Sequence, residues 1–177
     1  MPTPAELKVD RAIRLIMGIS GGEPGRLALT VDGVNGNDSN EGTRTNPLKT
    51  IQEAVDQIEA EEGYGHIFIL PATYAENVVV AKSNIVFEGV NRGGLEKCEI
   101  KPATGTGVVL GAGHCSLKNL RIETANDNAI EATGEQFLFD GLEIEVNSAA
   151  AYGIWLDNAD EAIITRCLLE GNNLANC

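Results

Sequence analysis

Basic and aromatic residues are both scarce in this chain. Its 177 residues include 13 Lys and Arg against 26 Asp and Glu, which gives a net charge of −13, and 5% of the residues are aromatic. A strongly negative surface repels phosphate backbones and anionic lipids, so nucleic-acid and membrane roles are disfavoured. Few aromatics and 20 glycines suit thin stacked coils with tight corners better than a helical bundle.

The sequence also shows no paired-cysteine spacing, no long apolar run and no secretory h-region with a cleavage site. Its four cysteines, Cys98, Cys115, Cys167 and Cys177, show no C-x-x-C spacing, so we expect no disulfide framework. Cys115 and Cys167 are expected to act as small apolar fillers. No run approaches the ~18 apolar residues of a membrane span, and residues 1–28 contain no signal-peptide pattern, so we expect no membrane insertion.

What the chain does contain is one apolar pattern written three times. The three copies are Leu117, Leu120 and Ile122, then Phe139, Leu142 and Ile144, then Ile164, Cys167 and Leu169. The copies are separated by 22 residues (139 − 117) and then by 25 (164 − 139). Self-similarity at this period indicates a solenoid whose coils must stack to bury their apolar sides.

The spacing within each copy indicates strands. Apolar residues alternate, except at Asn119, Gly141 and Arg166, where the phase slips by one residue and a bend is expected. This divides each coil into three short strands. We therefore predict an all-β fold, a right-handed parallel β-helix of about four coils that stack about 4.8 Å apart. Earlier strands are expected at residues 26–31, 66–71, 77–81 and 84–89.

Two helices are expected outside the repeats. Residues 4–17 are amphipathic and have no coil to stack on, so we assign residues 1–28 to an N-terminal arm for attachment or oligomerisation. The alternative is a helix folded back over the end of the solenoid. Residues 29–177 form the β-helix domain. Within it, Thr50 and Glu53 fit a capping box that begins a helix near residues 50–62, which covers the first coil.

Acidic and amide residues suggest two places where a cation could bind. Residues 32–42 are rich in Gly, Asn and Asp, which predicts a compact loop of Asx-turns or, alternatively, a Ca²⁺ site, although the EF-hand spacing is absent. Glu123, Glu145 and Glu170 keep the 22- and 25-residue spacing and so form an outward column. Stacked like charges predict raised pKa values or a bound metal. An acid/base pair and a chance alignment remain as alternatives.

Trp155 is a candidate for sugar binding. By alternation between Ile154 and Leu156 it points outward, in the column of Glu131 and near Asp157. An exposed indole can stack on a sugar ring while carboxylates bind the hydroxyls, which predicts a glycan-binding face. The alternative is an indole packed against a corner loop or a neighbouring subunit.

Four segments resemble pectin-lyase-like parallel β-helix domains. Residues 31–43 (VDGVNGNDSNEGT), 46–55 (NPLKTIQEAV) and 69–78 (ILPATYAENV) look like the start of such a domain, and residues 117–122 (LKNLRI) look like a rung. Domains that begin in this way are common in the N-terminal regions of bacteriophage tailspikes and tail fibres, and in secreted polysaccharide lyases. The resemblance covers residue 29 to the C-terminus and implies the fold more firmly than the activity.

The catalytic signatures of this class are missing. The chain has neither the Asn-x-Asp, Asp-Asp, Gly-His-Gly and Arg-x-Lys set of polygalacturonases nor the Arg-x-Pro-x-x-Arg pattern of pectate lyases. We assign no catalytic residue, and His66 and His114 are expected to be structural or solvent-facing.

The resemblance therefore implies a structural virion protein: a tail fibre, tailspike or virion-decorating β-helix. We expect a homotrimer, assembled in the host cytoplasm, that attaches to other virion proteins through residues 1–28 and contacts host surface polysaccharide. The alternative is an extracellular polysaccharide lyase or glycoside hydrolase of the same fold.

Overall fold

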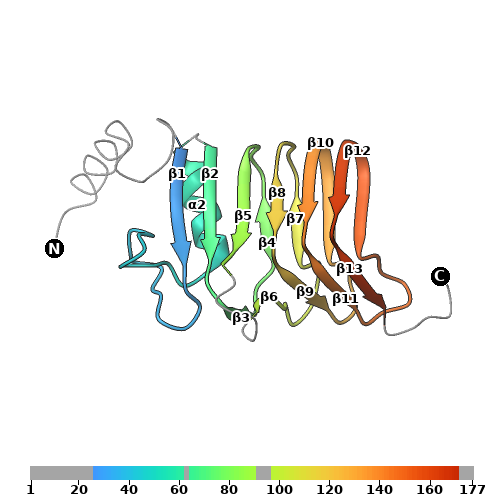
Figure 1. Ribbon diagram of the computed structural model, residues 1–177, viewed down its shortest axis with the longest axis horizontal. Helices are drawn as coiled ribbons and strands as arrows, with labels where there is room; N and C mark the ends of the chain where they lie inside the picture. Colours follow the sequence, from blue (N-terminus) through green and yellow to red (C-terminus); the bar gives the residue numbers. More distant parts are fainter. Residues whose placement is uncertain (1–25, 62–63, 91–96, 172–177) are drawn as a thin grey trace.

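The computed structural model describes residues 26–61, 64–90 and 97–171. Within these ranges the chain forms strands that all pair in parallel, together with one α-helix. The stack runs from β1 (Arg26–Val31) at one end to β12 (Ile154–Thr165) and β13 (Leu168–Gly171) at the other (Figure 1). The predicted all-β, parallel β-helix type of fold is confirmed.

The strands belong to two curled sheets. Besides β1 and β12, the larger sheet contains β2 (Tyr64–Ile69), β4 (Val78–Val80), β5 (Ile85–Gly89), β7 (Val108–Leu110), β8 (Ser116–Lys118) and β10 (Ile130–Asp140). Its order is β1-β2-β5-β8-β10-β7-β4, and β12 pairs with β10. Besides β13, the smaller sheet contains β3 (Ala72–Tyr74), β6 (Cys98–Ile100), β9 (Arg121–Thr124) and β11 (Glu143–Val146). Its order is β13-β11-β9-β6-β3.

The nine repeat residues occupy stacked rungs, as their spacing predicts. Leu117 pairs with Phe139 and Phe139 with Ile164, while Ile122 pairs with Ile144 and Ile144 with Leu169. The third set lies where the sheets meet: Leu120 and Leu142 are buried, and Cys167 packs against the core. The bends are also confirmed, because Asn119, Gly141 and Arg166 have φ angles of 53°, 66° and 52°. Residues with a side chain rarely adopt this left-handed region of φ. Where they do, the backbone changes direction, which produces the bend.

The prediction of three short strands in every coil is wrong for the later part of the chain. β10 and β12 each continue around a corner, so that a single strand provides two sides of a coil. The register between them shifts between Ala132 and Gly134, and Gly134 has a φ of 126°. A bulge of this kind bends a strand without ending its pairing. The left-handed Gln136 and Glu161 complete the same corners.

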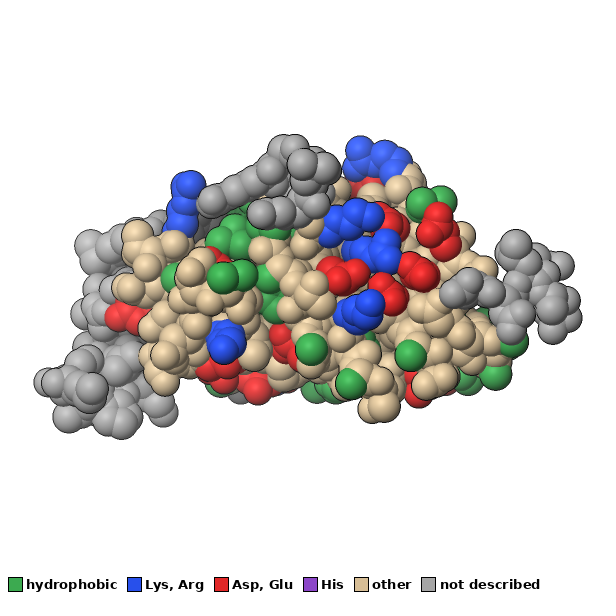
Figure 2. Space-filling view, turned by 90° about the horizontal axis from the view of Figure 1, so that it is seen from below, with side chains coloured by type: hydrophobic (Ala, Val, Ile, Leu, Met, Phe, Trp, Pro, Cys, Tyr) green, Lys and Arg blue, Asp and Glu red, His purple; other side chains and the backbone are tan. Residues whose placement is uncertain are grey.

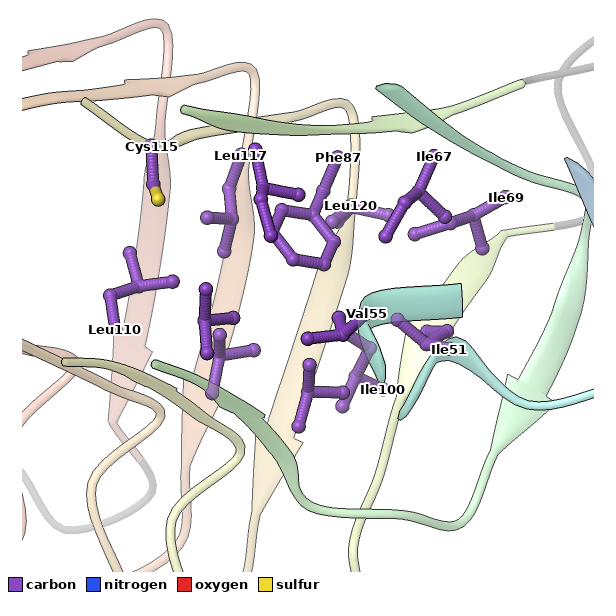
Figure 3. Close-up of a cluster of buried hydrophobic side chains, with 14 of the residues drawn as sticks. Ile51, Val55, Ile67, Ile69, Phe87, Ile100, Leu110, Cys115, Leu117 and Leu120 are labelled. Atoms are coloured by element: carbon purple, nitrogen blue, oxygen red, sulfur yellow. The ribbon is translucent and has the colours of Figure 1, made fainter. Parts of the chain in front are cut away.

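The helix α2 (Ile51–Ala60) closes the interior near β1 and β2 (Figure 1). Its apolar face is fully buried, and Ile51 and Val55 point into the same space as Ile67, Phe87 and Leu117 (Figure 3). Burying an aliphatic side chain of this size stabilises the fold by about 1.5–3 kcal/mol. The predicted helix near residues 50–62 therefore forms and packs where it was expected.

Only half of the predicted capping box forms. The Thr50 hydroxyl accepts from the Glu53 amide at 3.3 Å, but the Thr50 amide donates to Asp38 at 2.9 Å. Two further helix amides, those of Ile51 and Gln52, donate to the Glu76 carboxylate at 2.9 Å each. A carboxylate at this end of a helix is favoured by the helix dipole. Burial raises the pKa of Glu76 above its ordinary value, although these two bonds oppose the rise.

The two cysteines on inward positions lie against the core. Cys115 is fully buried, Cys167 packs against the core, and burial raises the pKa of the Cys115 thiol. Both therefore act as the apolar fillers that were predicted.

β1 begins at Arg26, inside the 1–28 range assigned to the arm. The expected helix at residues 4–17 and Cys177 lie outside the described residues.

Candidate functional site

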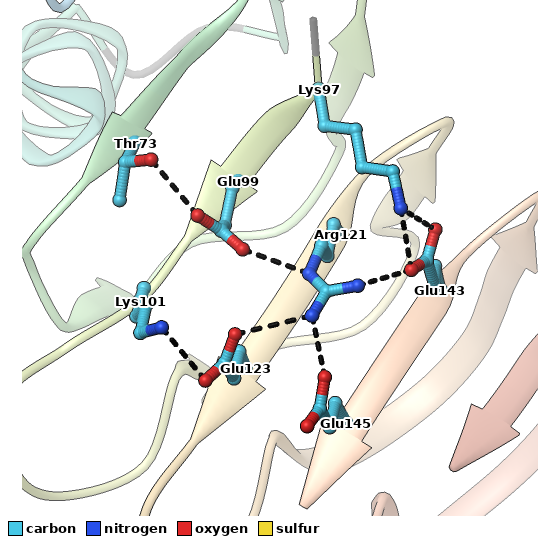
Figure 4. A network of polar contacts seen from close by, with 8 residues as sticks. All are labelled: Thr73, Lys97, Glu99, Lys101, Arg121, Glu123, Glu143 and Glu145. Atoms are coloured by element: carbon cyan, nitrogen blue, oxygen red, sulfur yellow. Dashed lines mark hydrogen bonds and ion pairs between the residues drawn. The ribbon is translucent and has the colours of Figure 1, made fainter. Parts of the chain in front are cut away.

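A cluster of charged side chains lies on the outer face of the smaller sheet. It contains Lys97, Glu99, Lys101, Arg121, Glu123, Glu143 and Glu145, and we call it the Arg121 cluster. Figure 2 shows acidic and basic side chains gathered over this face, and Figure 4 shows their contacts. Strand alternation places them outward, because Ile122 and Ile144 between them point into the core.

Arg121 is the centre of the cluster and contacts four carboxylates. Its strand neighbours in register are Glu99 on β6 and Glu143 on β11. The guanidinium donates through Nε to Glu99 at 2.8 Å and through Nη1 to Glu143. Its Nη2 donates to Glu123 at 3.2 Å and to Glu145 at 2.5 Å. One side chain therefore ties together three adjacent rungs.

Two lysines supply the other positive charges of the cluster. Lys97 donates to both oxygens of Glu143, at 2.7 and 2.6 Å, and Lys101 lies 2.8 Å from Glu123. The hydroxyl of Thr73 donates to Glu99 at 2.9 Å. Every carboxylate of the Arg121 cluster consequently has at least one cationic partner.

The electrostatics of the cluster favour the ionised forms of Glu123 and Glu143. The hydrogen bond from Lys101, reinforced by Arg121, lowers the pKa of Glu123, and the bond from Lys97 does the same for Glu143. Burial acts to lower the pKa of Arg121, but its bonds to the glutamates outweigh burial and raise it. General acids need raised carboxyl pKa values, so the shifts run against proton donation.

The predicted column of Glu123, Glu145 and Glu170 stands in register, but its electrostatics differ from the prediction. The expected rise in pKa is wrong for Glu123, because Arg121 and Lys101 neutralise the repulsion. Among the described residues no group of three or more His, Cys, Asp or Glu could hold a metal ion. The geometry therefore gives the predicted metal site no support.

Arg121 itself was missed by sequence reasoning, although a signal was present. Glu99, Arg121 and Glu143 are separated by 22 residues each (121 − 99 and 143 − 121). The same 22-residue spacing relates the apolar residues of the first two copies of the repeat, such as Leu117 and Phe139. Looking for opposite charges at that spacing would have found the centre of the cluster.

Trp155 lies outward, as the alternation predicts. Its side chain is 46% exposed and meets Tyr152 edge-to-face, with ring centroids 5.7 Å apart. Trp155 is in register with Glu131, but an oxygen of Glu131 already accepts from Thr106 and Asn128, at 2.9 Å each. Asp157 is exposed two residues further on. The three predicted glycan-binding residues are thus neighbours, and Tyr152 is an aromatic partner that was not foreseen.

His66 has a structural position, and His114 faces solvent. His66 Nε2 lies 2.9 Å from Glu88 on the next rung, and its ring stacks on Phe68 at 4.1 Å. Burial lowers the pKa of His66, although Glu88 opposes this. His114 is exposed at a corner with a left-handed φ of 57°. Neither histidine belongs to the Arg121 cluster.

The loop at residues 32–42 uses its own oxygens in turns. Asp32 accepts from the amides of Val34 and Asn35, and Asn37 accepts from the amide of Ser39, all at 2.9–3.0 Å. These are the Asx-turns that the composition predicts. The possibility of Ca²⁺ binding there stays a prediction.

Comparisons with known proteins agree with this architecture. The family described as "Protein of unknown function (DUF1565)" matches residues 34–175, and no curated protein matches the sequence. Two crystal structures of GH136 lacto-N-biosidase from Eubacterium ramulus, the selenomethionine derivative and the native protein, are similar to this chain. Their TM-scores are 0.60 and 0.56, and both are 12% identical to this chain.

The likeness to these structures concerns the fold alone. The alignments cover 81% and 93% of this chain but only 34% and 33% of the lacto-N-biosidase chains. This chain therefore spans about a third of their length. No helix among the described residues is long and apolar enough to cross a membrane. On the extent of the family match, the chain belongs to the DUF1565 family.

Proposed function

We propose that this domain is a non-catalytic structural module, a stiff β-helix that holds its place in a larger assembly. The observation that carries the proposal is the Arg121 cluster, which gathers four glutamates on the smaller sheet. Its carboxylates are all engaged by Arg121, Lys97 or Lys101, and the pKa values of Glu123 and Glu143 are lowered. Acid/base catalysis at this cluster would require at least one of its carboxyls to have a raised pKa. The cluster instead cross-links neighbouring rungs.

The assembly that the sequence favours is a phage virion. The segments at residues 31–43, 46–55 and 69–78 resemble the start of tailspike and tail-fibre β-helices. In this proposal the chain is a right-handed β-helix of about four coils that forms a homotrimer in the host cytoplasm. Residues 1–28 then attach it to other virion proteins.

Light scattering coupled to size-exclusion chromatography tests the oligomeric part. The full chain is expected to elute as a trimer, with three times its mass of 18.8 kDa. A monomer that persists at high protein concentration would contradict a spike. Co-purification of the chain with intact particles from a producing host would support the virion location, and its absence from purified particles would exclude it.

Glycan contact is a second candidate, favoured by the exposed pair Trp155 and Tyr152. Aromatic rings at a surface provide stacking area for sugar rings. We propose that this pair, with Asp157 and Glu131 beside it, touches host surface polysaccharide. Trp155→Ala should then abolish retention on immobilised capsular or lipopolysaccharide glycans. Tyr64→Ala is the matched control, because Tyr64 is 57% exposed on β2, near the other end of the stack.

The enzyme alternative has a direct test of its own. The lacto-N-biosidase structures have a similar fold, so a polysaccharide lyase or glycoside hydrolase remains the competing function. Incubating the chain with the same glycans and measuring product size separates the two. The structural proposal predicts glycans of unchanged length, and shortened products would refute it.

A further inference from the structure

The outer face of β10 and β12 combines an aromatic pair with a carboxylate. Trp155 on β12 is in register with Glu131 on β10, and the Trp155 ring meets that of Tyr152 edge-to-face. Trp155 and Tyr152 are 46% and 61% exposed. Trp155 and Glu131 point away from the core, so a further rung stacked on β12 would lengthen this face and leave its outer side open.

The carboxylate of Glu131 is held in place through one of its two oxygens. Thr106 Oγ1 and Asn128 Nδ2 each donate to Oε1 at 2.9 Å. Within residues 26–61, 64–90 and 97–171, no group donates to Oε2. A carboxylate oxygen that is fixed in this way and still open is a charge-assisted acceptor for a ligand hydroxyl.

Asn128 joins the carboxylate to the aromatic pair. Its side chain is 5% exposed, and its Oδ1 accepts from the Tyr152 amide at 2.7 Å while its Nδ2 donates to Glu131. A buried amide that uses both of its ends fixes its two partners relative to each other. The two rings and the open Oε2 therefore form one preorganised surface, which offers stacking area beside a hydrogen-bond acceptor. A sugar ring can use both contacts at once.

Charge decides which sugars this surface can accept. Residues 122–165, which include Glu131, Tyr152 and Trp155, contain ten Asp and Glu and neither Lys nor Arg. One of these acids, Asp157, is exposed two residues beyond Trp155. A uronate, sulfate or phosphate group on a ligand would meet like charge here, and the net charge of −13 on the whole chain adds to the repulsion.

We propose that Trp155, Tyr152 and Glu131 bind a glycan that lacks acidic groups. The Trp155 indole stacks on one face of a sugar ring, and Glu131 Oε2 accepts from one of its hydroxyls. Thr106 and Asn128 are positioning residues that hold the Glu131 carboxylate. This inference rests on the glycan contact proposed above and narrows its ligand: polysaccharides rich in uronate or phosphate are excluded from this face.

An array of paired glycans tests the ligand class with the full chain. Each neutral oligosaccharide is printed beside the same oligosaccharide with one hexose oxidised to a uronate. The bound glycans should be neutral, with at least ~10-fold higher affinity than their acidic partners, and added salt should reduce the difference. Trp155→Ala should weaken binding at least ~10-fold. Tyr64→Ala, which removes an exposed ring on β2, should bind as wild type does.

Variants of the polar residues separate a role in binding from a role in folding. Glu131→Lys should reduce the preference for neutral over acidic glycans at least ~5-fold, because it reverses the charge beside the rings. If circular dichroism shows that Glu131→Lys fails to fold, Glu131→Gln replaces it and should change the preference in the same direction. Thr106→Val should weaken binding at least ~3-fold, and Thr106→Ser should restore it, because serine keeps the hydroxyl that donates to Glu131.

The outcomes distinguish a wrong ligand class from a wrong function. Binding of acidic glycans that depends on Trp155 would overturn this inference and leave the glycan contact standing, whereas binding of no glycan would overturn both. An equal loss in Trp155→Ala and Tyr64→Ala would also overturn it. So would a Trp155→Ala variant that changes the oligomeric mass but keeps its glycan binding, because the rings would then belong to a subunit contact.

Discussion

Replacing Arg121 by methionine removes one guanidinium while keeping a long side chain over the sheet. Lys97 still holds Glu143, Lys101 still holds Glu123, and Thr73 still donates to Glu99. Glu145 loses its one ion-pair partner among the described residues. The cluster changes from four acids with three bases to four acids with two.

The expected loss of stability lies between the values for exposed and buried ion pairs. The side chain of Arg121 is 17% exposed, and those of its four glutamate partners are 16–28% exposed. Exposed pairs contribute about 0–1 kcal/mol, and breaking a buried pair costs about 3–5 kcal/mol. We expect a loss of about 2 kcal/mol for Arg121→Met, which lowers Tm by about 4–8 °C in a domain of this size.

The loss should depend on pH with a defined sign. The pKa values of Glu123 and Glu143 are lowered in the folded protein, so their ion pairs stabilise it above the ordinary glutamate pKa of about 4.3. This contribution disappears as the pH falls through the folded-state values. The difference between wild type and Arg121→Met should therefore be largest near pH 7 and shrink below about pH 4.

Urea unfolding followed by circular dichroism at pH 7 and at about pH 3 measures both quantities. Arg166→Met is the matched control, because Arg166 pairs with Asp140 but its side chain is 73% exposed. It should change stability little. An Arg121→Met effect no larger than that of the control, or one that stays constant between the two pH values, would refute the cluster as a cross-link.

Three further changes test the packing. Gly89→Ala should prevent stable folding, because a Cβ at Gly89 would lie 2.1 Å from the carbonyl oxygen of Asn119 on the next rung; a normal melting curve would contradict this close approach. Phe139→Ala should lower the free energy of unfolding by about 3–5 kcal/mol in urea titrations, since the ring is fully buried, and a loss below about 1 kcal/mol would place it at the surface. Glu76→Ala removes the acceptor for two amides of α2, so it should lower the free energy of unfolding by about 1–2 kcal/mol in the same titrations. An unchanged midpoint would show that this cap is dispensable.

The stacking of the rungs could be predicted from the sequence because the spacing of inward residues repeats from coil to coil. An inward residue such as Phe139 must stack on Leu117 and beneath Ile164 to leave water, so the 22- and 25-residue offsets set the register. The bends at Asn119 and Gly141 were visible for the same reason, since the alternation slips there.

Contacts between different kinds of segment could not be read in this way. Glu76 accepts from the start of α2, 25 residues earlier in the chain, and no repeat relates the two. β10 continues around its corner through Gly134 and Gln136, which have positive φ angles. Composition alone permits either a turn or a strand at these residues. The charges around Arg121 lay on the predicted spacing, but apolar periodicity does not reveal how outward side chains pair.

A crystal structure of the 177-residue chain, in which the contacts of Arg121 can be measured directly, is the strongest test of a domain built from stacked rungs. We expect Leu117, Phe139 and Ile164 in one inward file with about 4.8 Å between rungs. We also expect the Arg121 guanidinium within hydrogen-bond distance of glutamates from three strands. A shift of one residue between any two rungs would turn the inward file to solvent and separate Arg121 from its partners, and either observation would contradict this architecture.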